Sequence, residues 1–332
     1  MGGILVSQYN VVMTGKLLKP AEEKIFANCN VKQWEQVEPI PRELLYDWLK
    51  EAEGLVVTSN IHVDDELLKH APNVRVIAQA AVGYDNIDVD ACTRYGVPFG
   101  NTPGVLVETT ADLAFALLLS ATRRIHEGWN FVRDGKWIPG KSLPFGFDLY
   151  GKTLGIVGMG QIGAAVARRA HAFGMKIVYS NRNRRSDETE IGAKYLSFDD
   201  LLEQADCIIV LTPLTDETRG LFGKEQFAKM KPSAYFVNVA RGPVVDTSAL
   251  IDALKNGEIA YAALDVTDPE PLPVDHPLLQ LENILVTPHI GSATTETRSS
   301  MALLTADNLL AGLAGQPLPA CVNQTVNYKV KA

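Results

Sequence analysis

The sequence is poor in cysteine and contains no long hydrophobic run. It has four cysteines, and no two of them form a C-x-x-C pair, so neither a zinc site nor a disulfide framework is predicted. No apolar stretch reaches the roughly 18 residues that a membrane-spanning helix needs, and the N-terminus lacks the basic and apolar regions of a signal peptide. We therefore expect a cytoplasmic protein with no metal site and no membrane partner.

Positive charge is also scarce. The chain has 31 Lys and Arg residues against 39 Asp and Glu residues, which gives a formal net charge of -8. An acidic chain without blocks of basic residues is repelled by phosphate backbones, so we expect no nucleic-acid partner. The densest basic cluster, Arg182, Arg184 and Arg185, is large enough for only one phosphate group.

Short apolar runs alternate with helical patterns through most of the chain. The runs are continuous rather than alternating, as is typical of parallel strands covered on both faces. The length of 332 residues exceeds what a single core usually supports, so two domains are expected. The pattern predicts an α/β protein with two doubly wound parallel sheets. The predicted strands are residues 3–6, 55–57, 74–78, 153–157, 176–179, 207–211, 234–237 and 284–286.

The predicted helices locate the domain boundaries. Helical patterns cover residues 109–126, 164–173, 247–256 and 295–313, and residues 134–147 are predicted to form an irregular arm. We expect the chain to cross between domains near residue 100 and to return near residue 292. One domain would then be discontinuous, with residues 1–100 and 293–332, and the other would consist of residues 101–292.

A glycine-rich motif lies between the predicted strand 153–157 and the helix that follows. The first glycine of a GxGxxG motif permits a tight turn, the second lets the backbone approach a pyrophosphate, and the third lets helix and strand pack closely. The helix N-terminus then offers free N–H groups and a positive dipole to the anion. The motif predicts a dinucleotide site at Gly158, Gly160, Gln161, Ile162 and Gly163.

The end of the next strand indicates which dinucleotide is preferred. An NAD site places Asp or Glu there to bind the ribose 2′-hydroxyl, but in this sequence the first acid is Asp187. Small polar and guanidinium groups favour a 2′-phosphate, because Arg matches phosphate oxygens bidentately. We therefore expect NADPH to be preferred, with NADH possible, and a phosphate site at Ser180, Asn181, Arg182 and Arg185.

Three further segments bear unusual polar residues at predicted strand ends. Ligands of open α/β sheets bind at the carboxyl ends of strands, so Arg241, Glu270 and His289 are expected to converge. This trio suits hydride transfer to a carbonyl. Histidine protonates the developing alkoxide, glutamate favours the imidazolium, and arginine binds carboxylate and carbonyl oxygens in a planar fork.

The motifs GMGQIG, NVARGPVVD, LDVTDPEPL and TPHIGSAT occur in this order. Together they resemble the D-isomer-specific 2-hydroxyacid dehydrogenases, and within them most closely the glyoxylate/hydroxypyruvate reductases. The resemblance implies a Rossmann cofactor domain inserted in a flavodoxin-like substrate domain. It implies reduction of a small 2-oxoacid, glyoxylate or hydroxypyruvate, to the D-2-hydroxyacid.

The resemblance also implies roles for single residues. Arg241 would orient the substrate, Glu270 would pair with the acid/base His289, and Asp265 would contact the nicotinamide side of the cofactor. The remaining implied contacts are Thr110 and Pro213 with the cofactor, and the Val82 and Gly83 amides and Ser292 with the substrate.

The family is typically dimeric, so we expect a homodimer formed through the helix after Pro103 and the following arm. Trp137 in that arm either reaches the neighbour's site or makes a plain interface contact. Two other functions stay open: a 2-ketogluconate reductase, which would have the same motifs, and a nucleotide-sensing protein like the corepressors that resemble this family. Arg241 is the only obvious cation for a substrate, with Arg298 as a possible second, which favours an oxoacid with a single carboxylate.

Overall fold

The computed structural model describes residues 9–58 and 61–328, and the predicted strand at residues 3–6 lies outside them. The chain divides into two compact units. Unit 1 consists of Met1–Leu106 and Ala293–Ala332, and unit 2 is Val107–Ser292. The first crossing therefore falls a few residues after the predicted position near residue 100. Each unit is an α/β sandwich whose described strands are all parallel, which confirms the predicted fold class.

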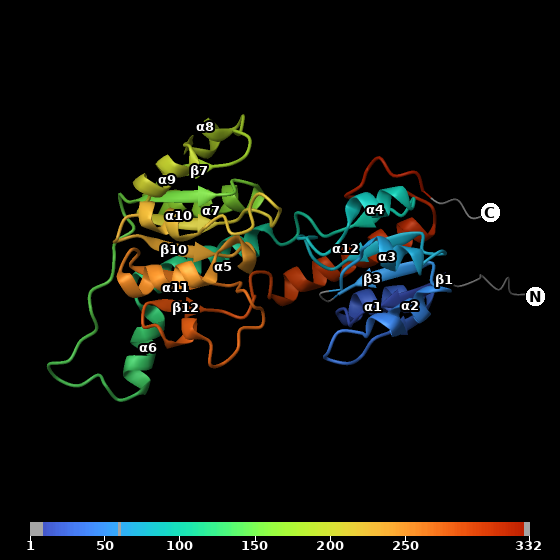
Figure 1. Cartoon of the computed structure of the whole chain (residues 1–332), viewed down its shortest axis with the longest axis horizontal. Coiled ribbons are helices and arrows are strands. Elements are labelled where there is room, and N and C mark those ends of the chain that lie inside the picture. The colour runs from blue at the N-terminus through green and yellow to red at the C-terminus, as the bar shows by residue number, and fades with distance from the viewer. Residues whose placement is uncertain (1–8, 59–60, 329–332) are drawn as a thin grey trace, which may run out of the picture. The chain divides into compact units, whose positions relative to one another are not determined.

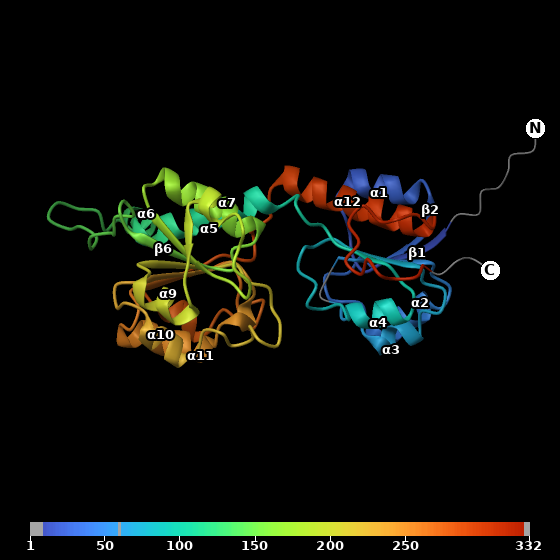
Figure 2. The same cartoon turned by 90° about the horizontal axis from the view of Figure 1, so that it is seen from above.

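Unit 1 is built on a five-stranded sheet with the order β2-β1-β3-β4-β5. Helices α1 and α12 cover one face, and α2, α3 and α4 cover the other (Figure 2). The strands and helices are β1 (Tyr9–Met13), α1 (Lys19–Phe26), β2 (Cys29–Gln33), α2 (Arg42–Leu49), β3 (Gly54–Val57), α3 (Asp65–Lys69), β4 (Val76–Gln79), α4 (Val89–Arg94), β5 (Phe99–Gly100) and α12 (Thr295–Leu313).

Helix α12 returns the C-terminal part of the chain to unit 1 and packs directly on its sheet. A Cβ at Gly312 would lie 2.4 Å from Val76 Cγ2, and one at Gly54 would lie 2.8 Å from Leu309 Cδ1. Glycine at these two positions therefore lets helix and sheet approach more closely than side chains would allow. The bounds Thr295–Leu313 match the predicted helix, because a Thr294 N-cap and a long apolar face mark it locally.

Unit 2 is built on a seven-stranded sheet with the order β12-β11-β10-β9-β6-β7-β8. Helices α5 and α7 cover one face, and α9, α10 and α11 cover the other (Figures 1 and 2). The elements are α5 (Val107–Thr122), α6 (Ile125–Arg133), β6 (Thr153–Val157), α7 (Gln161–Ala172), β7 (Lys176–Ser180), α8 (Glu188–Ile191), β8 (Ala193–Tyr195), α9 (Phe198–Gln204), β9 (Cys207–Val210), α10 (Lys224–Lys229), β10 (Tyr235–Asn238), η1 (Gly242–Val244), α11 (Thr247–Asn256), β11 (Tyr261–Leu264), η2 (Pro277–Gln280) and β12 (Ile284–Val286).

The order of the strands in unit 2 reverses between β6 and β9. From β6 the chain adds β7 and β8 on one side, and from β9 it adds β10, β11 and β12 on the other. Ligands in open α/β sheets bind at the carboxyl ends of the strands beside such a reversal. The segments that follow β6, β7, β10, β11 and β12 are therefore the candidate functional loops of this unit.

The helix predicted at residues 109–126 is interrupted, so that prediction is wrong at its C-terminal end. Helix α5 ends at Thr122, Arg124 takes a left-handed conformation with φ 53°, and α6 then begins. The Thr122 carbonyl accepts a hydrogen bond from the Phe147 amide at 2.8 Å. The returning arm thus binds the carbonyl at which the helix ends, and this long-range contact has no signal in the local pattern.

Candidate active site

The glycine-rich turn joins β6 to α7 and has the sterics of a phosphate-binding loop. A Cβ at Gly158, which has φ +100°, would lie 2.6 Å from the Thr212 amide nitrogen, and a Cβ at Gly163 would lie 2.7 Å from the Gly158 carbonyl oxygen. Gly160 has open space on its Cβ side. It is also the N-cap of α7, so the first-turn N–H groups at Gln161 and Ile162 face no capping side chain. The residues present therefore fit a dinucleotide pyrophosphate.

The Asn181 side chain, which follows β7, braces this turn. Its Oδ1 accepts a hydrogen bond from the Met159 amide at 2.6 Å, and the neighbouring Ser180 carbonyl accepts one from the Gly158 amide at 3.1 Å. Asn181 was predicted to contribute to a phosphate site, and in the structure its side-chain oxygen holds the glycine-rich loop. Sequence reasoning had no signal for this contact, because it joins residues 22 positions apart.

The three arginines after β7 differ in what they bind. Arg184 pairs with Glu188, and Arg185 pairs with Asp187 at 2.6 Å. Arg182 is exposed and forms no ion pair with a residue that the structure describes. Its charge acts on Glu217, whose pKa is lowered first by a hydrogen bond from Thr215 and further by Arg182. Arg182 is therefore the arginine of the cluster with the most free hydrogen-bonding capacity.

The loop after β10 presents Arg241. Asn238 at the end of this strand is buried, and its side chain accepts from the Ala240 amide at 3.0 Å and donates to the Arg241 carbonyl at 3.0 Å. A Cβ at Gly242 would lie 1.9 Å from the Thr267 carbonyl oxygen, so only glycine lets this loop meet the segment after β11. Asn238 and Gly242 together fix the backbone position of Arg241. Neither residue had an assigned role in the sequence analysis.

The loop after β12 presents His289 and is anchored by Asp265. The Asp265 carboxylate is 2% exposed and accepts from Thr287 Oγ1 at 2.7 Å, from the Ile290 amide at 2.8 Å and from the Gly291 amide at 2.8 Å. Its carbonyl also accepts from the His289 amide at 2.9 Å. His289 has φ 53°, a conformation that non-glycine residues seldom adopt and that clusters at functional sites.

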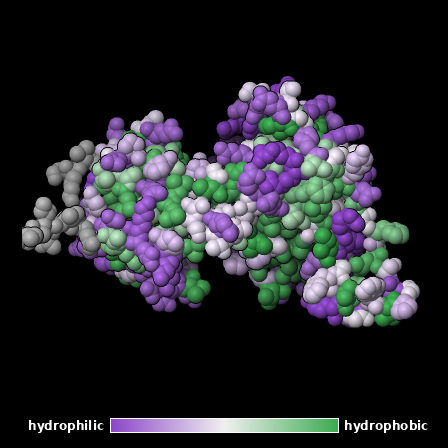
Figure 3. Space-filling model, turned by 180° about the vertical axis from the view of Figure 1, so that it is seen from behind, coloured by the Kyte–Doolittle hydropathy of each residue, from purple (hydrophilic) through white to green (hydrophobic). Residues whose placement is uncertain are grey.

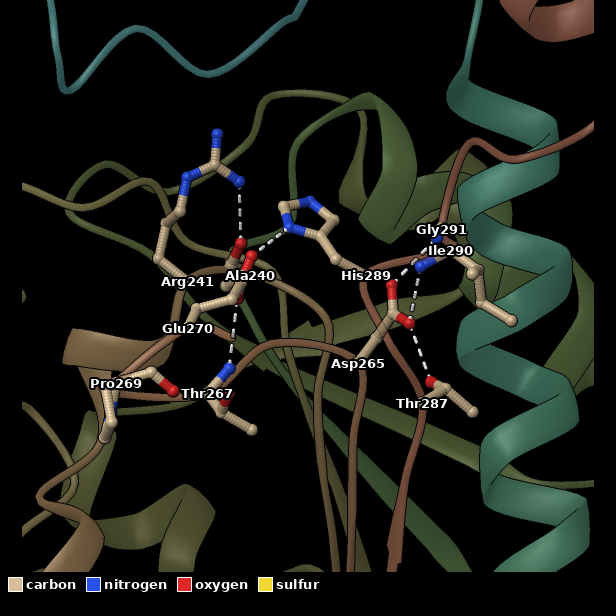
Figure 4. Close-up of polar contacts among 10 residues, drawn as sticks. All are labelled: Ala240, Arg241, Asp265, Thr267, Pro269, Glu270, Thr287, His289, Ile290 and Gly291. Carbon is tan, nitrogen blue, oxygen red and sulfur yellow. Dashed lines mark hydrogen bonds and ion pairs between the residues drawn. The ribbon is translucent and has the colours of Figure 1, made fainter. Parts of the chain in front are cut away.

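His289 and Glu270 form the central pair of the site (Figure 4). His289 Nδ1 lies 2.6 Å from Glu270 Oε1, and Glu270 Oε2 accepts from the Thr267 amide at 3.2 Å. Burial by itself would raise the pKa of Glu270, but the hydrogen bond and charge of His289, the Thr267 amide and the charge of Arg241 together lower it. Glu270 is therefore a carboxylate at neutral pH, and His289 is oriented with its Nε2 on the side away from Glu270.

Figure 4 shows Arg241 and His289 on the same side of Glu270. The His289 and Glu270 side chains are 47% and 36% exposed, so a ligand can reach them. The imidazole of His289 can donate or accept a proton, and the guanidinium of Arg241 can hold an anionic oxygen. This arrangement can bind a carboxylate beside a carbonyl and give the carbonyl oxygen a proton.

The remaining predicted site residues are Thr110, Pro213, Ser292, Val82 and Gly83. Thr110, on α5, packs at the loop of His289, since its Cγ2 would lie 3.5 Å from a Cβ at Gly291. The Pro213 carbonyl, in the loop after β9, accepts from Thr218 Oγ1 at 2.6 Å, and Ser292 is the last residue of unit 2. Val82 and Gly83 belong to unit 1, where they follow β4.

Neither a metal centre nor a membrane span is found among the residues that the structure describes. No group of three or more His, Cys, Asp or Glu side chains there could hold a metal ion. In the same residues, every helix is too short or too polar to span a bilayer.

Comparison with known proteins gives one consistent family. Residues 115–291 match the D-isomer specific 2-hydroxyacid dehydrogenase, NAD binding domain. A glyoxylate reductase from Korarchaeum cryptofilum is 47% identical over 319 residues, which are 95% of this chain and 96% of that protein. The crystal structure of a glyoxylate reductase from Paecilomyes thermophila has a TM-score of 0.87 at 34% identity and covers 96% of this chain and 100% of its own.

A third relative was solved with ligands. It is an NADPH-dependent glyoxylate/hydroxypyruvate reductase from Sinorhizobium meliloti in complex with NADP and malonate, with a TM-score of 0.88 at 31% identity, over 98% of this chain and 100% of that chain. The family match and the near-complete coverage of these relatives confirm the resemblance that the motifs indicate. This chain belongs to the D-isomer-specific 2-hydroxyacid dehydrogenase family of oxidoreductases.

Proposed function

We propose that this chain reduces small 2-oxoacids, chiefly glyoxylate and hydroxypyruvate, to D-2-hydroxyacids with NADPH. The observation that carries the proposal is the 2.6 Å contact between His289 Nδ1 and Glu270 Oε1, with Arg241 on the same side of the pair (Figure 4). The glyoxylate reductases that match nearly the whole chain support the choice of substrate.

In the proposed reaction, a dinucleotide whose pyrophosphate binds at the glycine-rich turn would supply a hydride from its nicotinamide to the carbonyl carbon. Arg241 would hold the substrate carboxylate and draw electron density from the carbonyl oxygen. His289 Nε2 would then donate a proton to that oxygen, which completes the hydroxyl group. Glu270 would keep the Nδ1 proton in place and stabilise the positive ring before the transfer.

The remaining predicted contacts are part of the same proposal. The Val82 and Gly83 amides would receive the substrate carboxylate, and Ser292 would contact the substrate's oxygen atoms. Contacts with the cofactor would come from Thr110, Pro213 and Asp265. Arg241 is the principal cation of these loops, so they fit a substrate with one carboxylate. A second anionic group would need a second cation.

NADPH is the proposed cofactor because the end of β7 has no carboxylate to repel a 2′-phosphate. Arg182 would bind that phosphate, while Arg184 and Arg185 already bind Glu188 and Asp187. The structure of the Sinorhizobium meliloti relative, which was solved with NADP, supports this preference.

A homodimer is also proposed, formed through α6 and the arm that follows it. This surface exposes Trp129 at 65% and Phe145 at 100%, and an apolar groove of about 270 Å³ lies between α6 and the arm. Figure 3 shows hydrophobic residues gathered on this part of unit 2, beside the projecting arm. Monomers seldom expose apolar patches of this kind, and a second copy would cover it.

A cytoplasmic location is proposed as well. Cys29, Cys92 and Cys207 are free and buried, and burial raises the pKa of the Cys29 thiol to about 11. Unreactive free thiols suit a reducing compartment.

The direct test is a panel of 2-oxoacids assayed with NADPH and with NADH. We expect the highest kcat/KM for glyoxylate and hydroxypyruvate with NADPH. A much higher kcat/KM on 2-ketogluconate would assign the enzyme to larger sugar acids instead. Absence of turnover on every oxoacid, with NADPH bound, would point to a nucleotide-sensing protein.

A further inference from the structure

The loop after β4 in unit 1 is held by two buried amide side chains. Gln79, the last residue of β4, donates from Nε2 to the Gly83 carbonyl at 2.5 Å. Asn101, which follows β5, donates from Nδ2 to the Val82 carbonyl at 2.9 Å. Both side chains come from the carboxyl ends of neighbouring strands and bind successive carbonyls of one short loop.

Holding these carbonyls also orients the amides that follow them. In a trans peptide the C=O of one residue and the N–H of the next point in opposite directions. The carbonyl bonded by Asn101 therefore fixes the direction of the Gly83 N–H, and the carbonyl bonded by Gln79 fixes that of the Tyr84 N–H. The preceding carbonyl, of Ala81, accepts from the Thr102 amide at 3.1 Å, which fixes the Val82 N–H in the same way.

The three N–H groups that follow these carbonyls therefore point away from the groups that bind the carbonyls. Within the part of the chain that the structure describes, Val82, Gly83 and Tyr84 donate no backbone hydrogen bond. Successive backbone N–H groups in a turn can form a concave site for an anion. A carboxylate has lone pairs for several such donors, and each charge-assisted bond is stronger than a neutral one.

Burying the side chain of Gln79 costs folding free energy that its packing does not explain. Its side chain is 4% exposed, and its Oε1 is buried with no hydrogen-bond partner among the described residues. An unsatisfied buried acceptor destabilises a fold, and an apolar side chain of equal length would avoid that cost. A residue that breaks a local packing rule in this way is expected at a functional position.

We propose that Gln79 and Asn101 are positioning residues that orient a receptor of three amides, Val82, Gly83 and Tyr84, for the carboxylate of the substrate. The Tyr84 amide is the added donor, and Gln79 sets its direction. This inference rests on the proposed function, because it assigns the anion as the carboxylate of the 2-oxoacid.

The test uses two variants that keep side-chain volume and remove the donor, Gln79→Met and Asn101→Leu. KM for glyoxylate should rise about three- to tenfold in each, the worth of one hydrogen bond. The inhibition constant of oxalate, a carboxylate that cannot be reduced, should rise in parallel. Values of kcat and of KM for NADPH should not change, since the carboxylate is held equally before and during the reaction. Gln79→Met should not lower Tm, because it also removes the unsatisfied oxygen.

Asn323→Ala is the matched control. Asn323 is 5% exposed and donates to the Val97 carbonyl at 3.0 Å, at the other end of β5. This variant should lower Tm and leave KM and the oxalate constant unchanged. An unchanged KM and oxalate constant in Gln79→Met, with a wild type that reduces glyoxylate, would overturn the positioning role.

Failure of the proposed function would be recognised separately, as a wild type without turnover on any 2-oxoacid. Oxalate binding measured by calorimetry on the NADPH-loaded protein then decides the inference. Weaker binding in Gln79→Met would still support it, whereas equal binding, or no binding by the wild type, would overturn it.

Discussion

The proposed chemistry depends, at the residue scale, on one carboxylate that remains charged beside an imidazole. The lowered pKa of Glu270 means that the pair loses its carboxylate only when the pH falls below the ordinary range of glutamate. The stabilisation from the pair is thus fully present above a pH of about 4.5 and is lost as the pH falls through the lowered pKa. His289 keeps its orienting partner across the range in which enzymes usually work.

The first prediction concerns Glu270→Gln. Without the carboxylate, the protonated ring of His289 is less stable, so the alkaline limb of the pH profile for reduction should move to lower pH. The difference in Tm between this variant and the wild type should be present at neutral pH and should narrow below a pH of about 4.5. Rate profiles and thermal melts over pH provide the measurement. A variant with an unchanged alkaline limb would show that Glu270 does not influence His289.

The second prediction concerns Arg182, the arginine of its cluster without an ion pair to a described residue. Arg182→Ala should raise KM for NADPH about tenfold, the value of one charge-assisted contact to phosphate, and should leave KM for NADH nearly unchanged. Arg184→Ala is the control, because Arg184 already binds Glu188, and both KM values should stay close to the wild type. Equal losses with the two cofactors in Arg182→Ala would contradict a 2′-phosphate role.

At the scale of elements, the site is held by loops that follow parallel strands, and one buried acid anchors the most strained of them. Asp265 binds four groups of the segment from Thr287 to Gly291 through its carboxylate and carbonyl. The positive φ of His289 persists because these bonds fix the residues on either side of it. The acid expected to contact the cofactor therefore also positions His289, the proposed acid/base residue.

The third prediction follows from this anchor. Asp265→Ala should lower the free energy of unfolding by on the order of 3 kcal/mol, since buried amides lose a charged acceptor, and should reduce kcat by on the order of a hundredfold as His289 loses its orientation. Asp246→Ala is the matched control, because Asp246 binds two amides at the start of α11. It should cost about 1 kcal/mol without changing kcat. A normal kcat in Asp265→Ala would refute the anchoring role.

The elements also show what could be predicted from the sequence. Strands such as β6 and β12 and helices α11 and α12 have the predicted bounds, because their apolar runs and caps are local signals. The strands β1, β2, β5, β8 and β11 were not predicted. Four of them have weak patterns, because β1, β2 and β8 are partly exposed and β5 is only two residues long. Glu270 and His289 were predicted together from strand-end chemistry, whereas the anchoring contacts of Asn238, Asn181 and Gln79 depend on tertiary geometry.

At the scale of the whole molecule, the exposed face of α6 indicates where two copies of the chain would associate. The apolar side chains Trp129, Val132 and Phe145 lie on α6 and its arm and are 65%, 50% and 100% exposed. A second copy would cover these apolar groups.

The fourth prediction is that the wild type is a dimer and that Trp129→Asp combined with Phe145→Asp makes it a monomer. Burying two new carboxylates in an apolar interface costs more than the lost contacts alone. Light scattering coupled to gel filtration gives the mass, and Val274→Asp, at a position 90% exposed outside this surface, is the control that should stay dimeric. A monomeric wild type at micromolar concentration would contradict the proposed homodimer.

The proposed enzyme adds a hydride and a proton to a 2-oxoacid to give the D-isomer of the hydroxyacid. The most direct test of this proposal is chiral analysis of the glycerate formed from hydroxypyruvate and NADPH by the wild-type enzyme. D-glycerate is the expected product. Replacing His289 by Ala should slow the formation of D-glycerate and the oxidation of NADPH to the same extent. Formation of L-glycerate, or D-glycerate at an undiminished rate in His289→Ala, would contradict the proposal.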